Sequence, residues 1–319
     1  MDAVMNGRSG RASTLRTRLV MAGAFIGALA VLSMSMLFSW PVSVKTAAST
    51  AADEAAAAFD SPSGTCLNWP ADNPRNMRRI SCDEPHIFEV ADNVDIGKDF
   101  GPNEPAPDVE GWQQIVTEQC TPVVAEYLGG KLDPAGKYTA GALKPTADQW
   151  RDGDRKLRCG LQRVTPSGER LLPTTGAAAD QDQSNIHEPG TCFALIDGQV
   201  GDPVDCGSAH SFEVVGHVDL AEALGPAYLP VDVQTEKLID LCQPVANAFT
   251  GARNLAEMGL SLYADTLSPE SWDAGSYRVN CKVGALEPDG QTMKAIRGSV
   301  KAEAAPESTT TSTSTTPTG

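Results

Sequence analysis

The chain has 319 residues and a formal net charge of −16, and only 6% of its residues are aromatic. Such an acidic protein repels nucleic-acid phosphates and anionic lipid headgroups, so the composition argues against a nucleic-acid partner. The length suits two or three domains, and modules of roughly 100 residues bury only a modest core.

The N-terminal part combines a basic segment with a long uncharged one. Arg8, Arg11, Arg16 and Arg18 precede Leu19–Phe38, which carries no charge. About 20 apolar residues span a bilayer as a helix, and flanking arginines stay in the cytoplasm. We therefore predict a cytoplasmic tail over 1–18, a transmembrane signal anchor over 19–40, and a single-pass cell-membrane protein with its bulk outside the cytoplasm. A cleaved signal peptide is the alternative, although its apolar region is usually about 7–15 residues long.

Three segments have the composition of connectors. Residues 41–63 are rich in Ala, Ser and Thr and predict a flexible spacer. Residues 164–189, rich in Gly, Pro, Ala and polar residues, predict a linker. The Ser/Thr/Pro segment at 301–319 cannot form a core and predicts a disordered tail.

Between these connectors the sequence repeats itself. In both stretches a Gly-Thr-Cys is followed by Cys-x3-His-x-Phe-Glu-Val, Cys-x-Pro-Val, Trp-x2-Gly and a final Cys nine residues after the Trp. All eight cysteines belong to these two sets of four. We therefore predict two tandem modules, over 64–163 and 190–300.

Each module predicts an α+β fold. The residues His86–Val90 are typical of a strand, and Lys156–Leu161 and Tyr277–Val283 of closing strands. On a regular strand, His86 and Glu89 would lie on opposite faces and would not meet without a bulge.

A long helix is expected before each closing strand. The apolar spacing of Gly111–Leu128 predicts an amphipathic helix, which Pro122 should kink or divide. Pro244 occupies the same place in the second module. The predicted fold class is therefore α+β, with two small disulfide-braced modules after one transmembrane helix.

The cysteines are best explained as structural disulfides, because thiols outside the cytoplasmic membrane are normally oxidised. Four cysteines allow three pairings per module. We favour first with second and third with fourth: Cys66–Cys82, Cys120–Cys159, Cys192–Cys206 and Cys242–Cys281. The alternatives are a metal site built on Cys-x3-His or a redox pair. Zinc signatures need two close-spaced ligand doublets, and redox pairs usually have Cys-x-x-Cys, so we expect neither.

Four residues at repeated positions are candidates for ligand or partner contact: His86, His210, Trp150 and Trp272. The structural alternative is a half-buried histidine with satisfied ring nitrogens and a tryptophan that packs in the core. The sequence has no nucleophile elbow, P-loop, dinucleotide fingerprint or His-Glu-x-x-His motif, so we expect no enzymatic activity and no cofactor. A hydrolase built on a carboxylate pair is a weaker third hypothesis.

This motif set resembles the septum formation family of actinobacteria. The residues that carry the resemblance in the first module are the Gly64-Thr65-Cys66 start, Cys82-x3-His86-x-x-Glu89-Val90, Cys120, and Pro145-Thr146-x3-Trp150-x-x-Gly153-Asp154-Arg155-x3-Cys159. The second module departs from the pattern at Ser276-Tyr277, where the first has Asp154-Arg155. Any contact that Asp154 and Arg155 make is therefore expected to be missing there.

The resemblance implies a membrane-anchored envelope protein linked to formation of the division septum, without catalytic residues to transfer. We therefore expect a non-enzymatic protein that binds envelope or division proteins or cell-wall components outside the membrane. The alternative is an extracytoplasmic ligand-binding or envelope-stress sensing protein without a septal role.

Overall fold

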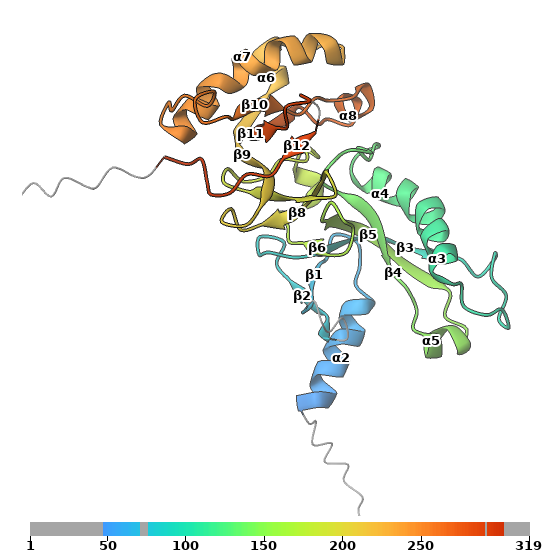
Figure 1. Ribbon diagram of the computed structural model, residues 1–319. Helices are drawn as coiled ribbons and strands as arrows, with labels where there is room; N and C mark the ends of the chain where they lie inside the picture. Colours follow the sequence, from blue (N-terminus) through green and yellow to red (C-terminus); the bar gives the residue numbers. More distant parts are fainter. Residues whose placement is uncertain (1–46, 71–75, 291, 303–319) are drawn as a thin grey trace, which may run out of the picture. The chain divides into compact units, whose positions relative to one another are not determined.

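The computed structural model describes residues 47–70, 76–290 and 292–302. Its fold is α+β, with two antiparallel sheets and helices beside each (Figure 1). The contacts described below lie in one compact unit that begins at Ala51. In this described part of the chain, no helix is long and apolar enough to cross a membrane. The predicted tail over 1–18 and anchor over 19–40 lie outside the described residues.

The first sheet has the strand order β2-β1-β3-β5-β4, and β6 pairs with the end of β5. Its strands are β1 (Cys66–Asn68), β2 (Arg78–Ile80), β3 (Phe88–Asp95), β4 (Thr139–Leu143), β5 (Lys156–Val164) and β6 (Leu171–Leu172). The strand β5 contains the predicted closing strand and continues beyond Cys159. The strand β3 begins two residues after His86, so His86 lies outside the regular strand.

The second sheet repeats this order as β8-β7-β9-β11-β10, with β12 paired to the end of β11. Its strands are β7 (Cys192–Ile196), β8 (Gln199–Val204), β9 (His210–Asp219), β10 (Ser261–Ala264), β11 (Arg278–Leu286) and β12 (Met293–Lys294). The two sheets thus share a connectivity, strand for strand.

Proline affects the two long helical regions differently. The first consists of α3 (Val109–Ile115), a π-helical segment (Val116–Cys120) and α4 (Thr121–Tyr127), so the helix is divided just before Pro122. Proline lacks the N–H that the preceding turn would use, which favours such a break. In the second region α7 (Val231–Thr250) runs through Pro244 without interruption, so Pro244 does not divide the helix there. Buried Cys242 and Ala246 lie on either side of this proline and hold the helix on its sheet.

The shorter helical elements complete the fold: α2 (Ala47–Phe59), α5 (Ala147–Arg151), a 3-10 turn (Ala178–Asp180), α6 (Leu220–Leu224) and α8 (Pro269–Asp273). Thr146 caps α5 in a capping box with Gln149, and Ser268 caps α8 through the backbone N–H of Ser271. These short helices place Trp150 and Trp272 against their sheets.

Four disulfides brace the fold, and they are the four pairs that the spacing favours. Cys120–Cys159 and Cys242–Cys281 each tie the long helical region to the closing strand, with Cα–Cα distances of 5.1 and 5.5 Å. All four cysteines of these two bonds are fully buried. One face of each sheet is therefore covered by a helix that is covalently attached to it.

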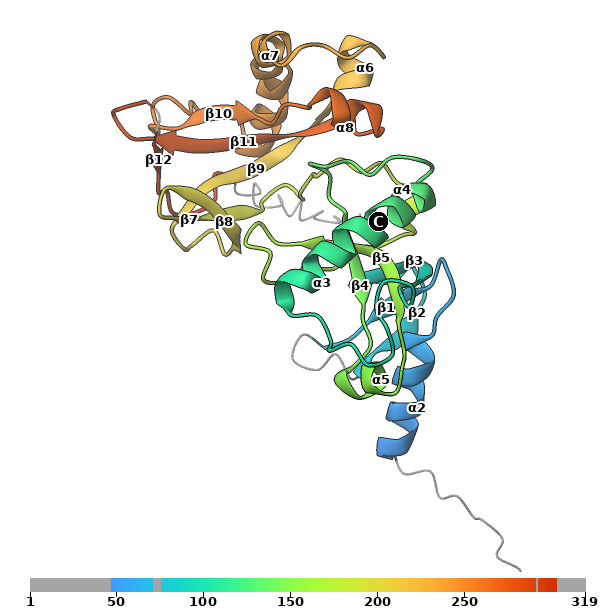
Figure 2. The ribbon, with the colours of Figure 1, turned by 90° about the vertical axis from the view of Figure 1, so that its right-hand side faces the viewer.

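The predicted flexible spacer over 41–63 is wrong for its described part, because Ala47–Phe59 forms α2. Alanine has the highest helix propensity, so an alanine-rich composition is compatible with a helix as well as with a flexible spacer. The last turn of α2 packs on the sheet face opposite α3 and α4, where Ala58 contacts the core of Leu67, Met77, Phe88 and Val90 (Figure 2). Residues 41–46 lie outside the described part.

The predicted linker over 164–189 is also wrong in its first half. It contains β6 and the 3-10 turn, and Thr174 forms a β-bridge with His86. Ala178 is buried in the core of the first sheet. The corresponding bridge in the second sheet joins His210 to Ile296. The Gly, Pro and Ala residues of 164–180 therefore form a return segment against the sheet.

Candidate functional site

The repeated histidine and glutamate lie closer together than a regular strand allows. The distance from His86 Nε2 to Glu89 Oε2 is 3.7 Å, so the prediction that they would not meet is wrong. The reason is that β3 begins only at Phe88, and His86 lies before the regular strand. In the second sheet Ser211 is an extra residue, because Phe212 opposes Phe193 and His210 opposes the next residue, Ala194. This extra residue is a β-bulge.

Both glutamates hold the return segment that follows the closing hairpin. Glu89 Oε2 accepts a hydrogen bond from Ala178 N at 2.8 Å, and Glu213 Oε2 accepts one from Val300 N at 2.6 Å. The second carboxylate oxygen accepts from Tyr127 Oη in the first sheet and from Ser299 Oγ in the second. The motif therefore has an internal structural role.

Burial and hydrogen bonding shift the pKa values of the first pair. Burial alone would lower the pKa of His86, but the nearby Glu89 carboxylate and a hydrogen bond to the Glu84 carbonyl raise it above its usual value. Burial alone would raise the pKa of Glu89, but the nearby His86 ring and hydrogen bonds from Tyr127 and Ala178 N lower it overall. The charged pair is thus favoured inside the protein.

The second histidine lacks this arrangement. His210 Nδ1 lies 2.9 Å from the Ser208 carbonyl, as His86 Nδ1 lies 3.0 Å from that of Glu84. His210 Nε2, however, is buried without a hydrogen-bond partner among the described residues. Thr174, whose hydroxyl lies 3.3 Å from His86 Nε2, is replaced by Ile296. Both histidines are buried, and neither presents a surface for a partner.

The two tryptophans are buried as well. The Arg155 guanidinium stacks 3.7 Å from the Trp150 ring, and the Trp150 indole N–H donates to the Glu104 carbonyl. In the second sheet the Tyr277 ring packs edge-on against Trp272 at 4.8 Å. Tyr277 thus provides the packing that Arg155 provides in the first sheet. The different sequence at Ser276-Tyr277 therefore replaces a cation–π contact with a contact between two aromatic rings.

Two groups of potential metal ligands occur among the described residues: Cys66, His86 and Glu89, and Cys192, Cys206 and Glu213. Their cysteines form disulfides. A cysteine binds metal as a thiolate, so the oxidised cysteines cannot act as ligands. These groups do not fit a metal while the disulfides stand.

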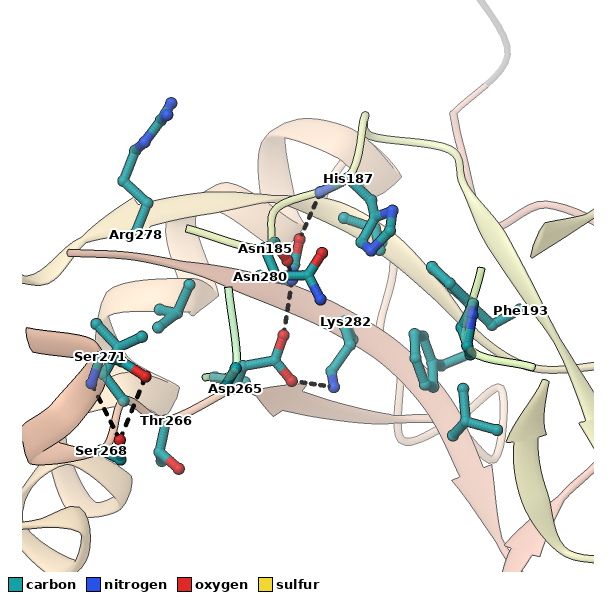
Figure 3. A pocket seen from close by; sticks show the side chains of 18 of the residues that line it. Asn185, His187, Phe193, Asp265, Thr266, Ser268, Ser271, Arg278, Asn280 and Lys282 are labelled. Atoms are coloured by element: carbon teal, nitrogen blue, oxygen red, sulfur yellow. Dashed lines mark hydrogen bonds and ion pairs between the residues drawn. The ribbon is translucent and has the colours of Figure 1, made fainter. Parts of the chain in front are cut away.

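A cavity of about 640 Å³ lies on the face of the second sheet opposite α7. This volume falls in the range of about 300–1,000 Å³ that is typical of small-molecule sites. Its apolar wall includes Phe193, Phe212, Val214 and Leu267, and polar side chains gather on β11 and just after β10. Figure 3 shows Phe193 and His187 on one side of these polar groups and Ser268 and Ser271 on the other.

Three polar side chains form a connected network in the cavity. The Asp265 carboxylate accepts from Lys282 Nζ through Oδ1 and from Asn280 Nδ2 through Oδ2, the latter at 2.7 Å (Figure 3). Asn280 Oδ1 accepts from His187 N at 2.9 Å, which fixes the amide of Asn280. The network therefore presents charged groups of both signs in fixed positions.

His187 joins this wall as a neutral ring. Its ring lies edge-on to Phe193 at a centroid distance of 4.7 Å. Burial, with the Arg163 guanidinium beside the ring, lowers the pKa of His187 to about 4. Because the ring is uncharged at neutral pH, it contributes a donor or an acceptor and an aromatic edge, but no charge.

The same face of the first sheet is filled. There Leu67, Phe88, Val90 and Leu143 pack together beneath Ala58 of α2. By their place relative to the cysteines, the corresponding residues of the second sheet are Phe193, Phe212, Val214 and Asp265. The exception is Leu143, whose counterpart is the charged Asp265; each precedes its closing cysteine by 16 residues. A face packed beneath α2 in the first sheet thus corresponds to a face with a cavity and charged groups in the second.

The repeated motifs do not include Asp265, Lys282, Asn280 or His187. The signal was available in the repeat, because aligning the closing cysteines places Asp265 opposite a leucine. That mismatch becomes meaningful only with the knowledge that both residues lie on the face opposite the long helix.

Comparisons with known proteins give one family and two curated relatives. The family model described as "Septum formation" matches residues 63–281. Two curated relatives, each called "Uncharacterized membrane protein", come from Mycobacterium tuberculosis strains CDC 1551 / Oshkosh and ATCC 25618 / H37Rv. Each is 38% identical over 237 residues, which is 72% of this chain and 52% of the relative. The chain therefore spans about half the length of these relatives. No solved structure matches the chain.

Proposed function

Because the chain belongs to the septum formation family, we propose that it is a non-enzymatic envelope protein that binds cell-division or cell-wall components outside the cytoplasmic membrane. The observation that carries the binding role is the cavity of the second sheet, where charged and aromatic side chains converge on a face that α2 covers in the first sheet. Sites of this kind hold small ligands or the ends of larger ones.

The membrane location of this proposal rests on two observations. Relatives that match most of the chain are called membrane proteins. The uncharged segment Leu19–Phe38 follows four arginines, which suits a single-pass anchor over 19–40 with its N-terminus in the cytoplasm. The remainder, residues 41–319 with a net charge of −19, then lies outside the membrane. Its four disulfides are compatible with that oxidising location.

We further propose that the two sheets are tandem copies of one module. The shared strand order, the matching disulfides and the two matching glutamate contacts support a duplication. The first copy would then run from about 64 to 180, and the linker would shorten to about 181–189. In one copy this face packs beneath α2, and in the other it borders a cavity.

A binding role is preferred to a hydrolytic one because the repeated polar residues are engaged internally. Both Glu89 and Glu213 accept hydrogen bonds from the return segments, and His86 and His210 are buried. A hydrolase would need such groups within reach of a substrate. Hydrolysis of peptidoglycan by the purified chain, abolished in His86→Ala, would overturn this part of the proposal.

Time-lapse localisation of a tagged, functional copy tests the division role. The native host would carry a fluorophore that matures outside the membrane, and the control would be a tagged membrane protein without a division role. We expect enrichment at midcell before constriction. An even distribution through the division cycle would contradict the septal role and leave the alternative, a ligand-binding or stress-sensing protein of the envelope.

A further inference from the structure

The charged groups of the cavity have hydrogen-bonding capacity left over. An ammonium has three N–H donors, and among the described residues Asp265 is the one hydrogen-bond acceptor of Lys282. A carboxylate has about four lone-pair positions, and Asp265 uses two of them, for Lys282 and Asn280. Lys282 and Asp265 can therefore each take a further group of opposite charge without giving up their mutual contact.

Both groups are also accessible from the cavity. The side chains of Lys282 and Asp265 are 17% and 39% exposed. The Lys282 ammonium lies 4.5 Å from the centroid of the Phe212 ring, which holds it in the wall instead of in open water. Figure 3 shows Arg278, the other cation of the lining, pointing away from this pair. The accessible part of the site thus offers one positive and one negative group side by side.

This balance narrows the class of ligand. The chain has a net charge of −16, so a site for a simple cation would need no lysine, which repels a cation. In a site for a simple anion, the aspartate would repel the ligand. A ligand that carries both an ammonium and a carboxylate satisfies both groups. The apolar edges of Phe193 and Leu267 in the lining suit the short aliphatic side chains of such a ligand.

We propose that this cavity binds the zwitterionic end of a short peptide, with the ligand's ammonium on Asp265 and its carboxylate on Lys282. Asn280, oriented by His187 N, holds Asp265 in place and is a positioning residue. The proposal rests on the proposed function, since peptidoglycan stem peptides carry such an amino-acid end and are cell-wall components. The recognised part of the cell wall would then be the stem peptide.

Isothermal titration calorimetry of the purified full chain, with its disulfides intact, tests this directly. The probe is a disaccharide–tripeptide whose diaminopimelate side chain ends in a free ammonium and a free carboxylate. The comparison ligands are the same molecule acetylated on that amine, the same molecule amidated on that carboxylate, and the disaccharide without peptide. We expect binding of the free form and a loss of about tenfold or more on either modification, because each removes a charge-assisted hydrogen bond.

Substitutions in the cavity lining provide a second test. Asp265→Leu introduces the residue that Leu143 represents in the first sheet, and Lys282→Met removes the ammonium but keeps a long side chain. Each should weaken binding of the free form by about tenfold or more and abolish the discrimination against one of the two modified ligands. Asp148→Asn is the control, because Asp148 is an exposed partner of Arg151 outside the cavity lining. A thermal unfolding scan verifies that each variant is folded.

The outcomes separate this inference from the septal role. Equal affinity for all three peptide ligands, binding of the disaccharide alone, or no binding of any ligand would overturn the zwitterion site, whatever the protein's location. Selective binding without midcell enrichment would keep the site and contradict the septal role. The ligand comparison uses the unaltered protein, so it decides the question even if a cavity variant fails to fold.

Discussion

At the scale of single residues, two glutamates meet the same need with different donors. Glu89 Oε1 accepts from the Tyr127 hydroxyl, while the residue at the place of Tyr127 in α7 is Phe249, which has no hydroxyl. There Ser299, from the return segment itself, donates to Glu213. A buried carboxylate must have its lone pairs satisfied, so the loss of one donor required the gain of another.

We therefore predict that Tyr127→Phe destabilises the protein by about 1.5–3 kcal/mol, the usual worth of a hydrogen bond to a charged group. Tyr263→Phe is the matched control, because the Tyr263 hydroxyl is buried without a hydrogen-bond partner among the described residues. Its removal should leave stability unchanged or slightly raised. Denaturant unfolding followed by circular dichroism measures both, and equal effects of the two substitutions would contradict the role of Tyr127.

The His86–Glu89 pair gives a pH dependence whose sign follows from the two pKa shifts. The pKa of His86 is raised above 6.5, so its contribution to stability is full below about 6.5 and is lost as pH rises through the raised pKa. The pKa of Glu89 is lowered from 4.5, so its contribution is full above about 4.5 and is lost as pH falls through the lowered pKa. Both contributions are therefore present together between about 4.5 and 6.5.

We expect the urea midpoint to be highest in that window and to decline on both sides. His86→Gln should flatten the decline on the alkaline side, and Glu89→Gln the decline on the acid side. An NMR titration of the His86 ring measures its pKa independently. An alkaline decline of the same size in His86→Gln would show that another group causes it.

At the scale of elements, residue spacing predicted the disulfides correctly. The spacer prediction, which used composition alone, was wrong for its described part. The separation of 39 residues between Cys120 and Cys159, repeated between Cys242 and Cys281, reflects one helix-to-strand distance and fits the favoured pairing, which the structure has. The alanines of α2 have the composition of a spacer, yet they form a helix because Ala58 and Phe59 find partners on the first sheet. Such partners lie far away in the sequence.

The cavity also depends on contacts between residues that lie far apart in the sequence. The mismatch of Leu143 and Asp265 is visible once the cysteines are aligned. Its meaning depends on α2, which covers one sheet face and has no counterpart over the other in the described part of the chain. Hydrophobic periodicity describes which face of an element is apolar, but it does not say what covers that face.

The docking of α2 can be tested through Phe59. Its ring lies 4.0 Å from the guanidinium carbon of Arg158, which also binds Asp60 at 2.5 Å. Phe59→Ala removes the ring contact, so the last turn of α2 should open more often and its amides should exchange about tenfold faster. Glu54→Gln, an exposed change in the same helix, should leave exchange unchanged. Hydrogen exchange measured by mass spectrometry would contradict the contact if both variants behaved alike.

At the scale of the whole molecule, one buried carboxylate links the two sheets. Asp133 follows α4 of the first sheet, and it accepts hydrogen bonds from Ser271, in α8 of the second, at 2.8 Å and from Ser276, just after α8, at 2.5 Å. Gln183 binds the backbone on either side of this contact, at Asp133 N and at the Ala274 carbonyl. The contact is fully buried, so its hydrogen bonds are not replaced by water when they are lost.

We predict that Asp133→Ala destabilises the protein by about 3 kcal/mol and separates the unfolding of the two sheets, because it leaves two buried hydroxyls without their acceptor. Asp273→Asn is the control, since the Lys131–Asp273 ion pair crosses the same boundary with side chains that are 59% and 66% exposed. An exposed pair of this kind is worth about 0–1 kcal/mol. Scanning calorimetry should show one transition for the control and two for Asp133→Ala. One unshifted transition in both would mean that the sheets are coupled elsewhere, and the open face of the second sheet would then not depend on Asp133 for its position.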